Sequence, residues 1–130
     1  MIKDRLNFAE QYLVDAKILC QNKKWNSAVG RAYYASYQAM WASLGDPSEE
    51  NIWRHLAIIK HFVRGYWIDP THAKDAPGLF ETLRLPLRRL YMDRIRVDYD
   101  AVSLNEVSAR TAIQIVESVL QVIKERKENI

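Results

Sequence analysis

The sequence predicts an all-α protein, an up-and-down bundle of four to five helices. Apolar residues recur at alternating steps of three and four in five stretches, which is the period of helices that bury one face. Only four glycines and four prolines are present, too few for a loop-rich or all-β chain. The connections are mostly short, and 130 residues correspond to a single domain, residues 1–130.

The first two helices have the most regular patterns. Residues 2–21 carry apolar side chains on one face, and Asn22-Lys23-Lys24 interrupts the pattern. Residues 25–44 form a second helix, which Gly45 and Asp46-Pro47 end, because glycine accepts a left-handed conformation and proline disrupts helices. One line of this helix contains only small residues: Ala28, Ala32, Ala35, Ala39 and Ala42. Such a line lets another helix approach closely, so we expect the second helix inside the core.

A third helix is expected from Ser48-Glu49-Glu50, which offers an N-cap and an acidic first turn, to about Gly65. Its predicted core line consists of Ile52, Leu56, Ile59, Val63 and Tyr66. His55 and Phe62 share a neighbouring line. Residues 67–77 show no period and contain two prolines, which predicts the longest loop.

The fourth helix is expected to end near Val97. Its predicted inward residues are Phe80, Leu83, Leu87 and Leu90. Pro86 predicts a kink, or a break with a restart near Leu85, because proline removes one backbone hydrogen bond and clashes with the preceding turn.

Asp98-Tyr99-Asp100 is expected to form the next turn. Ser103 and Glu106 then have the spacing of a capping box, in which Ser103 caps the N-terminus of the fifth helix. That helix repeats apolar residues through Ile123, before a charged tail.

The net charge of +3 is too small to indicate nucleic-acid binding by itself. Five arginines against one acid between Arg84 and Arg96 form a basic stripe, either a binding surface or a solvated face. The single cysteine, Cys20, cannot form an internal disulfide and is expected to be buried. No apolar run is long enough to cross a membrane and no signal peptide is evident, so the predicted localisation is cytoplasmic.

Most motifs of known chemistry are absent from the sequence. There is no glycine-rich phosphate loop and no HExxH zinc helix. His55, His61 and His72 lack a partner at metal-ligand spacing, so no metal and no cofactor are predicted. His61 and His72 are expected at the surface or in loops, and His55 half-buried beside the core.

Arg94, Asp98 and Tyr99 form the constellation of greatest interest. Arg94 continues the inward line of the fourth helix, and Asp98 lies one turn further on. A guanidinium on a core line needs partners, because burying an unpaired charge is costly. Arg31 of the second helix is a further cation that could meet Asp98 or Asp100.

Two interpretations of this constellation are open. These groups can form a structural clasp that fixes the turn after the fourth helix. Alternatively, they form a phosphate or RNA site in which Arg94 supplies charge and Tyr34, Tyr99 or Trp41 stacks on a base. Because arginine does not transfer protons at neutral pH, cleavage would need another proton carrier.

The pattern Ala28-x-x-Arg31-Ala32-Tyr33-Tyr34-Ala35, then His55 with Phe62, then Arg94-x-x-Val97-Asp98-Tyr99 resembles the HEPN domain family. The resemblance is closest to small stand-alone prokaryotic HEPN proteins and covers nearly the whole chain. It implies an all-α homodimer with a cleft between protomers. Many members are RNases of toxin–antitoxin or defence systems, often encoded beside a minimal nucleotidyltransferase.

The nuclease members of that family use an Arg-x4–6-His motif late in the domain. Arg94 matches the arginine of the motif, but no histidine follows it. Asp98 and Tyr99 only occupy the neighbourhood of the missing imidazole. The departure predicts a chain without the usual RNase chemistry.

Three hypotheses about function follow. The first is a module of a toxin–antitoxin or nucleotidyltransferase-linked system that binds nucleotide, RNA or protein, with Arg31, Tyr34, Arg94, Asp98 and Tyr99 as its binding residues. The second is an RNase toxin with a divergent site, in which Arg94 positions phosphate and Asp98 or His55 moves protons. The third is a structural dimerisation module. A homodimer is expected in each case, because four tryptophans and seven tyrosines in a small bundle favour an interface.

Overall fold

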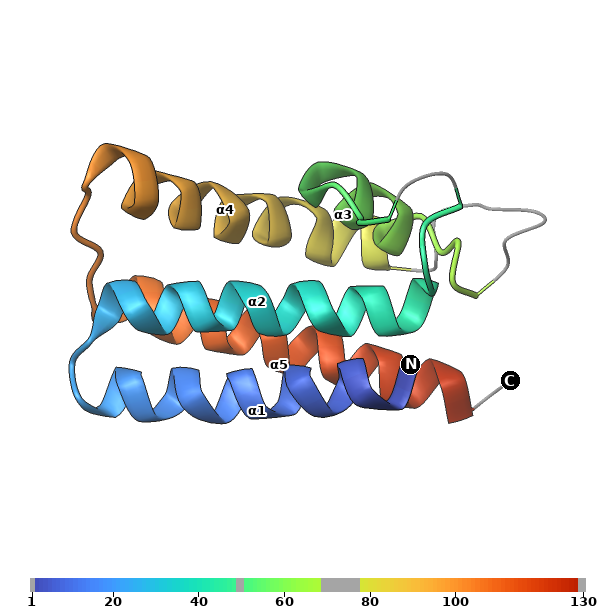
Figure 1. Ribbon diagram of the computed structural model, residues 1–130, viewed down its shortest axis with the longest axis horizontal. Coiled ribbons are helices and arrows are strands. Elements are labelled where there is room, and N and C mark those ends of the chain that lie inside the picture. Colours follow the sequence, from blue (N-terminus) through green and yellow to red (C-terminus); the bar gives the residue numbers. More distant parts are fainter. Residues whose placement is uncertain (1, 49–50, 69–77, 129–130) are drawn as a thin grey trace.

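The computed structural model describes residues 2–48, 51–68 and 78–128, which contain five helices and no strand (Figure 1). The helices are α1 (Ile2–Gln21), α2 (Trp25–Leu44), α3 (His55–Val63), α4 (Leu79–Asp100) and α5 (Glu106–Glu128). The four long helices alternate in direction along the long axis. The short helix α3 comes between α2 and α4 in the chain and packs against both. The all-α, up-and-down prediction is confirmed.

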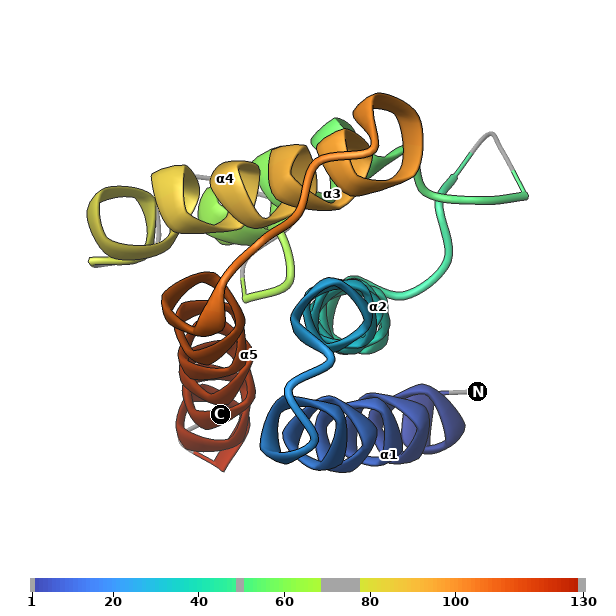
Figure 2. The same cartoon turned by 90° about the vertical axis from the view of Figure 1, so that its left-hand side faces the viewer.

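Helix α2 lies at the centre of the bundle and packs against each of the other helices (Figure 2). The predicted line of small residues on α2 is fully buried. Because alanine adds little bulk, α1 can pack closely along α2. Larger side chains such as Tyr33, Met40 and Phe62 fill the surrounding space.

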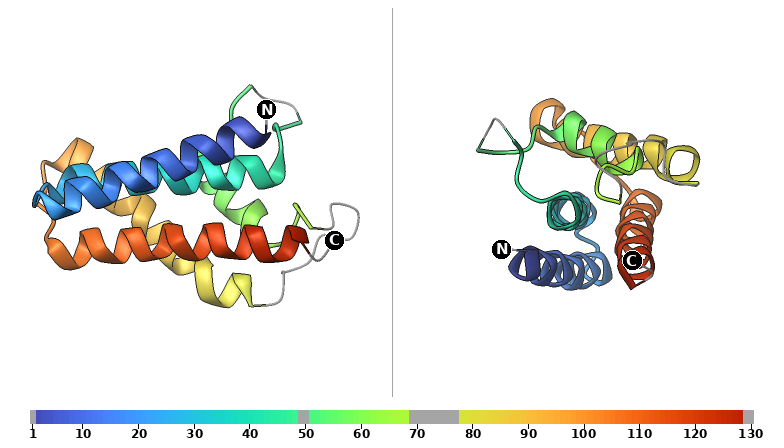
Figure 3. Two further views of the ribbon diagram at one scale, coloured as in Figure 1. Left: turned by 90° about the horizontal axis from the view of Figure 1, so that it is seen from below. Right: turned by 90° about the vertical axis from the view of Figure 1, so that its right-hand side faces the viewer.

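Helices α1 and α5 pack together on the side of the bundle away from α3 (Figure 3). Lys17 pairs with Glu117 at 3.2 Å, and Lys124 pairs with Glu10 at 3.1 Å. Both ion pairs are largely exposed and contribute little to stability beside the buried apolar contacts. In the described part of the chain, none of the helices is both long enough and apolar enough to cross a membrane.

Gly45 ends α2 as predicted. Its φ of 83° is in the left-handed region, and its N–H donates to the carbonyl of Trp41 at 2.8 Å. The indole N–H of Trp41 donates to Asp46 at 2.9 Å, which fixes the start of the following loop.

The predicted start of α3 was wrong. The helix begins at His55, and Ile52 and Leu56, predicted core residues, are exposed. The cause is Trp53: its indole donates to the carbonyl of Gly45 at 2.7 Å, and its own carbonyl accepts from the hydroxyl of Tyr37. These bonds hold the chain before His55 in an extended form against the end of α2. Glu49 and Glu50, the predicted first turn, lie outside the described residues.

The predictions for α4 were partly wrong. The helix continues through Pro86 without a break and reaches Asp100. Leu83 and Leu87 are buried on both sides of the proline, and their packing offsets the lost hydrogen bond. Leu90 is buried as expected, whereas Phe80 is only partly buried. Asp98-Tyr99-Asp100 therefore forms the last turn of α4 instead of a connecting turn.

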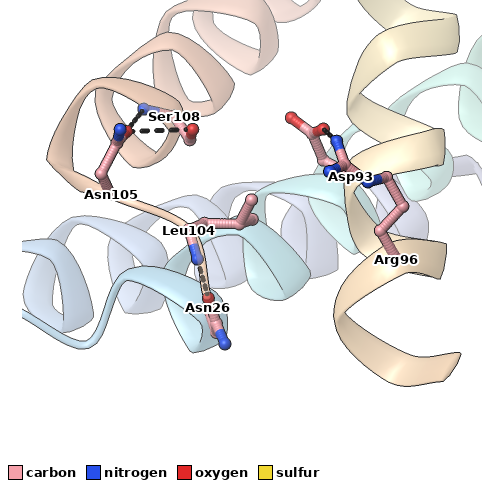
Figure 4. A network of polar contacts seen from close by, with 6 residues as sticks. All are labelled: Asn26, Asp93, Arg96, Leu104, Asn105 and Ser108. Carbon is pink, nitrogen blue, oxygen red and sulfur yellow. Dashed lines mark hydrogen bonds and ion pairs between the residues drawn. The ribbon is translucent and has the colours of Figure 1, made fainter. Parts of the chain in front are cut away.

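Asn105, and not Ser103, caps α5 (Figure 4). The Asn105 side chain accepts from the backbone N–H of Ser108 at 2.9 Å. The reason is a contact with α2: the Asn26 amide donates to the carbonyl of Val102 and accepts from the N–H of Leu104, at 3.2 and 2.8 Å. This contact fixes the connection so that Asn105 is the residue preceding the helix.

Candidate functional site

Arg94 lies between a tyrosine of α2 and a carboxylate of its own helix. Its Nη2 donates to the hydroxyl of Tyr34 at 2.7 Å, and its Nε is 3.4 Å from Oδ2 of Asp98. The predicted Arg94–Asp98 pair is present because α4 remains helical beyond Asp98, which places the two side chains one turn apart. The Arg94 side chain is 20% exposed, so the guanidinium is held in place and still reaches the surface.

Two aromatic rings support the same guanidinium. The Cζ atom of Arg94 is 5.2 Å from the ring centroid of Tyr33 and 4.9 Å from that of Tyr34. The two rings meet edge to face, with centroids 5.8 Å apart. Cation–π attraction therefore adds to the hydrogen bond and the ion pair in fixing Arg94.

His55, the first residue of α3, joins this arrangement through Tyr33. The Tyr33 hydroxyl and Nδ1 of His55 share a hydrogen bond. The imidazole also stacks on Tyr91 of α4, with ring centroids 5.2 Å apart and planes 20° apart. We call Tyr33, Tyr34, His55, Tyr91, Arg94 and Asp98 the Arg94 site. Three helices supply it.

The electrostatics of the Arg94 site favour a neutral imidazole. Burial, followed by the nearby Arg94 charge, lowers the pKa of His55 below its usual value. Burial also raises the pKa of Tyr33, so its hydroxyl keeps its proton. The protonated hydroxyl can donate to Nδ1 in the imidazole tautomer that carries its proton on Nε2.

Two predicted site residues take no part in this network. Tyr99 is 81% exposed at the end of α4. Arg31 lies 5.6 Å from the ring centroid of Tyr12, and among the described residues it forms no ion pair with Asp98 or Asp100. The predicted Arg31–Asp98 or Arg31–Asp100 contact was therefore wrong, because Arg31 extends toward α1 and Asp98 pairs along α4.

Arg31 is nevertheless connected to the edge of the Arg94 site. The Tyr12 ring under Arg31 is 6.1 Å from the ring of Tyr34, centroid to centroid. In the sequence, Tyr12 belongs to the apolar face of residues 2–21. The helical period gives no sign that it bridges Arg31 and Tyr34, because that contact joins two helices.

Trp41 was a stacking candidate, and this prediction was wrong. It is buried, and Arg5 covers its ring with Cζ 3.6 Å from the centroid. Arg5 also donates to the side chain of Gln38 at 2.9 Å, so α1 covers both Gln38 and Trp41 at this end of α2.

The other histidines stay outside the Arg94 site. His61 is half-buried between Trp53 and Tyr66 and not at the surface, and its Nδ1 lies 2.9 Å from the carbonyl of Ala57. His72 lies outside the described residues. Within the described ranges, no group of three or more histidine, cysteine, aspartate or glutamate residues could hold a metal ion. Cys20 is a buried free thiol, as expected.

The fold and the Arg94 site define a helical domain with a cationic, tyrosine-lined site built by α2, α3 and α4. The chain belongs to the HEPN family: the family model described as HEPN domain matches residues 2–127. It is 30% identical over 129 residues to a Methanocaldococcus jannaschii protein named "Putative toxin MJ0605". The aligned region covers 99% of this chain and 90% of that protein. No solved structure matches.

Proposed function

We propose that this chain is the HEPN component of a toxin–antitoxin or nucleotidyltransferase-linked system and binds RNA or a nucleotide at the Arg94 site. The name of the M. jannaschii relative, a putative toxin, supports the toxin–antitoxin setting. The observation that carries the proposal is the guanidinium of Arg94, fixed by Tyr34 and Asp98 yet still in reach of solvent. A prepositioned guanidinium matches a phosphate group in shape and charge.

The remaining groups of the site suit the rest of a nucleotide. Tyr34 is 38% exposed, and its ring can stack on a base. Tyr99 is more exposed and lies in the last turn of α4, after Arg94. The Nε2 proton of His55 can donate to a phosphate oxygen. Arg31 adds positive charge at the edge through its contact with Tyr12.

Binding is favoured over cleavage by the state of His55. The Nδ1 atom of His55 is already bound to the Tyr33 hydroxyl, so this nitrogen is not open to a substrate proton. The sequence has no histidine after Arg94 that could act as the second proton carrier. Binding needs only the donors and rings that are already present.

A direct binding experiment tests the proposal. Fluorescence anisotropy with a short labelled single-stranded RNA should give an affinity that Arg94→Ala weakens by about tenfold, because a charge-assisted hydrogen bond is lost. The slope of the logarithm of the affinity against the logarithm of the salt concentration should also decrease, by about the amount expected for one lost phosphate contact. Arg96→Ala is the matched control, since Arg96 is exposed on the same helix and pairs with Asp93. Equal binding by the wild type and Arg94→Ala would reject the proposal.

A divergent RNase is the second candidate function, and one observation favours it. His55 and Arg94 both contact Tyr33, His55 through the hydroxyl and Arg94 over the ring. In this case Arg94 would position the phosphate, and Asp98 or His55 would move the proton. RNA cleavage and growth arrest should then be lost in Arg94→Ala and in His55→Ala. Activity that is absent in the wild type, or unchanged in both variants, would exclude this candidate.

Association with other chains is also proposed and separately testable. A homodimer predicts twice the monomer mass by light scattering at micromolar concentration. Partnership with an antitoxin or nucleotidyltransferase predicts co-elution with the product of a neighbouring gene. If calorimetry with ATP, GTP and short RNAs gives no heat but the dimer is present, the structural dimerisation module replaces the binding module.

A further inference from the structure

A groove of about 340 Å³ lies between α3 and the first half of α4, and it shares no residue with the Arg94 site. Four apolar residues form its floor: Leu56, Ile59, Val63 and Phe80. Four cationic residues form its rim: Lys60, Arg64, Arg84 and Arg88. We call it the basic groove and propose that it binds an acidic amphipathic helix of a partner protein.

The groove follows the register of two helices. Its α3 residues recur at steps of three and one from Leu56 to Val63, which keeps them on one face of the helix, and Arg64 follows directly after the helix. Its α4 residues recur at steps of four from Phe80 to Arg88. The helices run antiparallel, since His55 at the start of α3 stacks on Tyr91, whereas Val63 at its end meets Phe80 in the groove. The floor is therefore a strip along two helices, which suits an elongated ligand.

The charge of the rim calls for an anionic occupant. Among the described residues, no acidic side chain lines the groove. Within the described residues, none of the four rim cations has a carboxylate partner, although the ion pairs elsewhere bind Lys17, Lys124, Arg94, Arg96 and Arg110. Arg84 lies over the ring of Phe80, with Cζ 5.1 Å from the centroid. Like charges on both sides of one groove repel, and an acidic ligand relieves that repulsion.

The floor favours a protein helix over RNA. Leu56 is 49% exposed at the groove, an uncovered apolar side chain that a partner's leucine or isoleucine can cover. RNA is recognised through exposed ring faces and hydrogen bonds to base edges, but the ring of Phe80 is already covered by Arg84 and the other floor residues are aliphatic. An apolar floor between basic rims matches a helix whose apolar stripe is flanked by acids.

The basic groove adjoins the Arg94 site, because Leu56 follows His55 directly in α3. A helix seated in the groove would therefore lie next to the proposed RNA site. The inference does not depend on RNA binding there, because it rests on different residues.

The test uses a synthetic, labelled peptide of about 14 residues, or four helical turns, with leucines on one face and glutamates beside them. A peptide of the same composition with the stripe scrambled is its control. Anisotropy should show binding of the striped peptide at least about tenfold tighter than of the scrambled one, and a loss of about tenfold or more in Arg84→Glu/Arg88→Glu. In the wild type, NMR should show shifts of the Leu56 and Val63 methyl groups.

Matched variants keep the result interpretable. Lys23→Glu/Lys24→Glu changes the net charge equally at the turn between α1 and α2, at the other end of the bundle, and should leave binding unchanged (Figure 1). Circular dichroism checks the fold of each variant. If the charge-reversed variant Arg84→Glu/Arg88→Glu does not fold, the neutral variant Arg84→Gln/Arg88→Gln replaces it. The proposal would be overturned if both peptides bound equally or if neither bound at millimolar concentration. It would also be overturned if single-stranded RNA bound more tightly than the striped peptide and lost the same affinity in Arg84→Glu/Arg88→Glu. Conversion of a dimer to a monomer by the rim variant would overturn it too, because a second copy would then occupy the groove.

Discussion

The hydroxyl of Tyr33 and Nδ1 of His55 share a hydrogen bond that joins the middle of α2 to the first residue of α3. Tyr33 is almost fully buried and also carries Arg94 over its ring. One tyrosine thus positions both the imidazole and the guanidinium of the Arg94 site.

Tyr33→Phe should destabilise the protein by about 1–2 kcal/mol, because it removes the hydrogen bond and leaves Nδ1 of His55 without its partner. The ring and its packing are retained, so the fold should survive. Urea unfolding followed by circular dichroism measures the change. Tyr12→Phe is the control, with an expected change within about 0.5 kcal/mol, since Tyr12 is less buried. Equal losses in both variants would contradict the role given to the Tyr33–His55 bond.

The stability of the protein should fall on acidification through the titration of His55. Its folded-state pKa is lowered, so the unfolded chain binds more protons between the two pKa values, and folding stability rises with pH in that range. The stability that depends on a neutral His55 is fully present above the pKa of histidine in the unfolded chain, about 6.5, and is lost as the pH decreases from there through the folded-state pKa. Urea unfolding between about pH 8 and pH 5 should show this slope in the wild type and a smaller slope in His55→Gln. An unchanged slope would exclude His55 as its source.

Arg94→Gln should raise the pKa of His55 relative to the wild type. The positive charge of Arg94 lowers that pKa, and glutamine removes the charge while keeping hydrogen-bonding groups. Burial still acts in the variant, so the pKa should not return fully to its ordinary value. NMR titration of the His55 ring protons measures the shift. Arg96→Gln, on the same helix, should have a smaller effect, because among the described residues the charge that lowers the His55 pKa is that of Arg94.

Asn105→Ala should cost about 1 kcal/mol, because α5 loses the side chain that caps it. Ser103→Ala should change stability by less than about 0.5 kcal/mol, since Ser103 is exposed before the helix. Thermal unfolding of the two variants separates the cap in the structure from the cap that the sequence predicted. The reverse order of the two losses would mean that the helix starts at the capping box after all.

Ala35→Leu should destabilise the protein by about 1–3 kcal/mol or prevent folding, because Ala35 is fully buried in the line of small residues on α2. Ser27→Leu is the control, since Ser27 lies exposed on the same helix. Chemical unfolding of both variants provides the comparison. A neutral Ala35→Leu would show that the close approach to α2 is not required.

The sequence by itself determined what depends on neighbours along the chain. The apolar period gave the bounds of α1 and α2, Gly45 gave the end of α2, and the four-residue spacing gave the Arg94–Asp98 pair, because helix periodicity and termini are local properties. The family pattern gave the HEPN assignment, since it is carried by residue types in order.

Only the tertiary structure decided the features that depend on contacts between distant segments. Trp53 bound to Gly45 moved the start of α3 to His55, and Asn26 moved the cap of α5 to Asn105. The packing of α3 on α4 brought His55 to Tyr91 and, through Tyr33, to Arg94. No periodicity encodes such meetings, because they arise from how the helices pack and not from spacing within one helix.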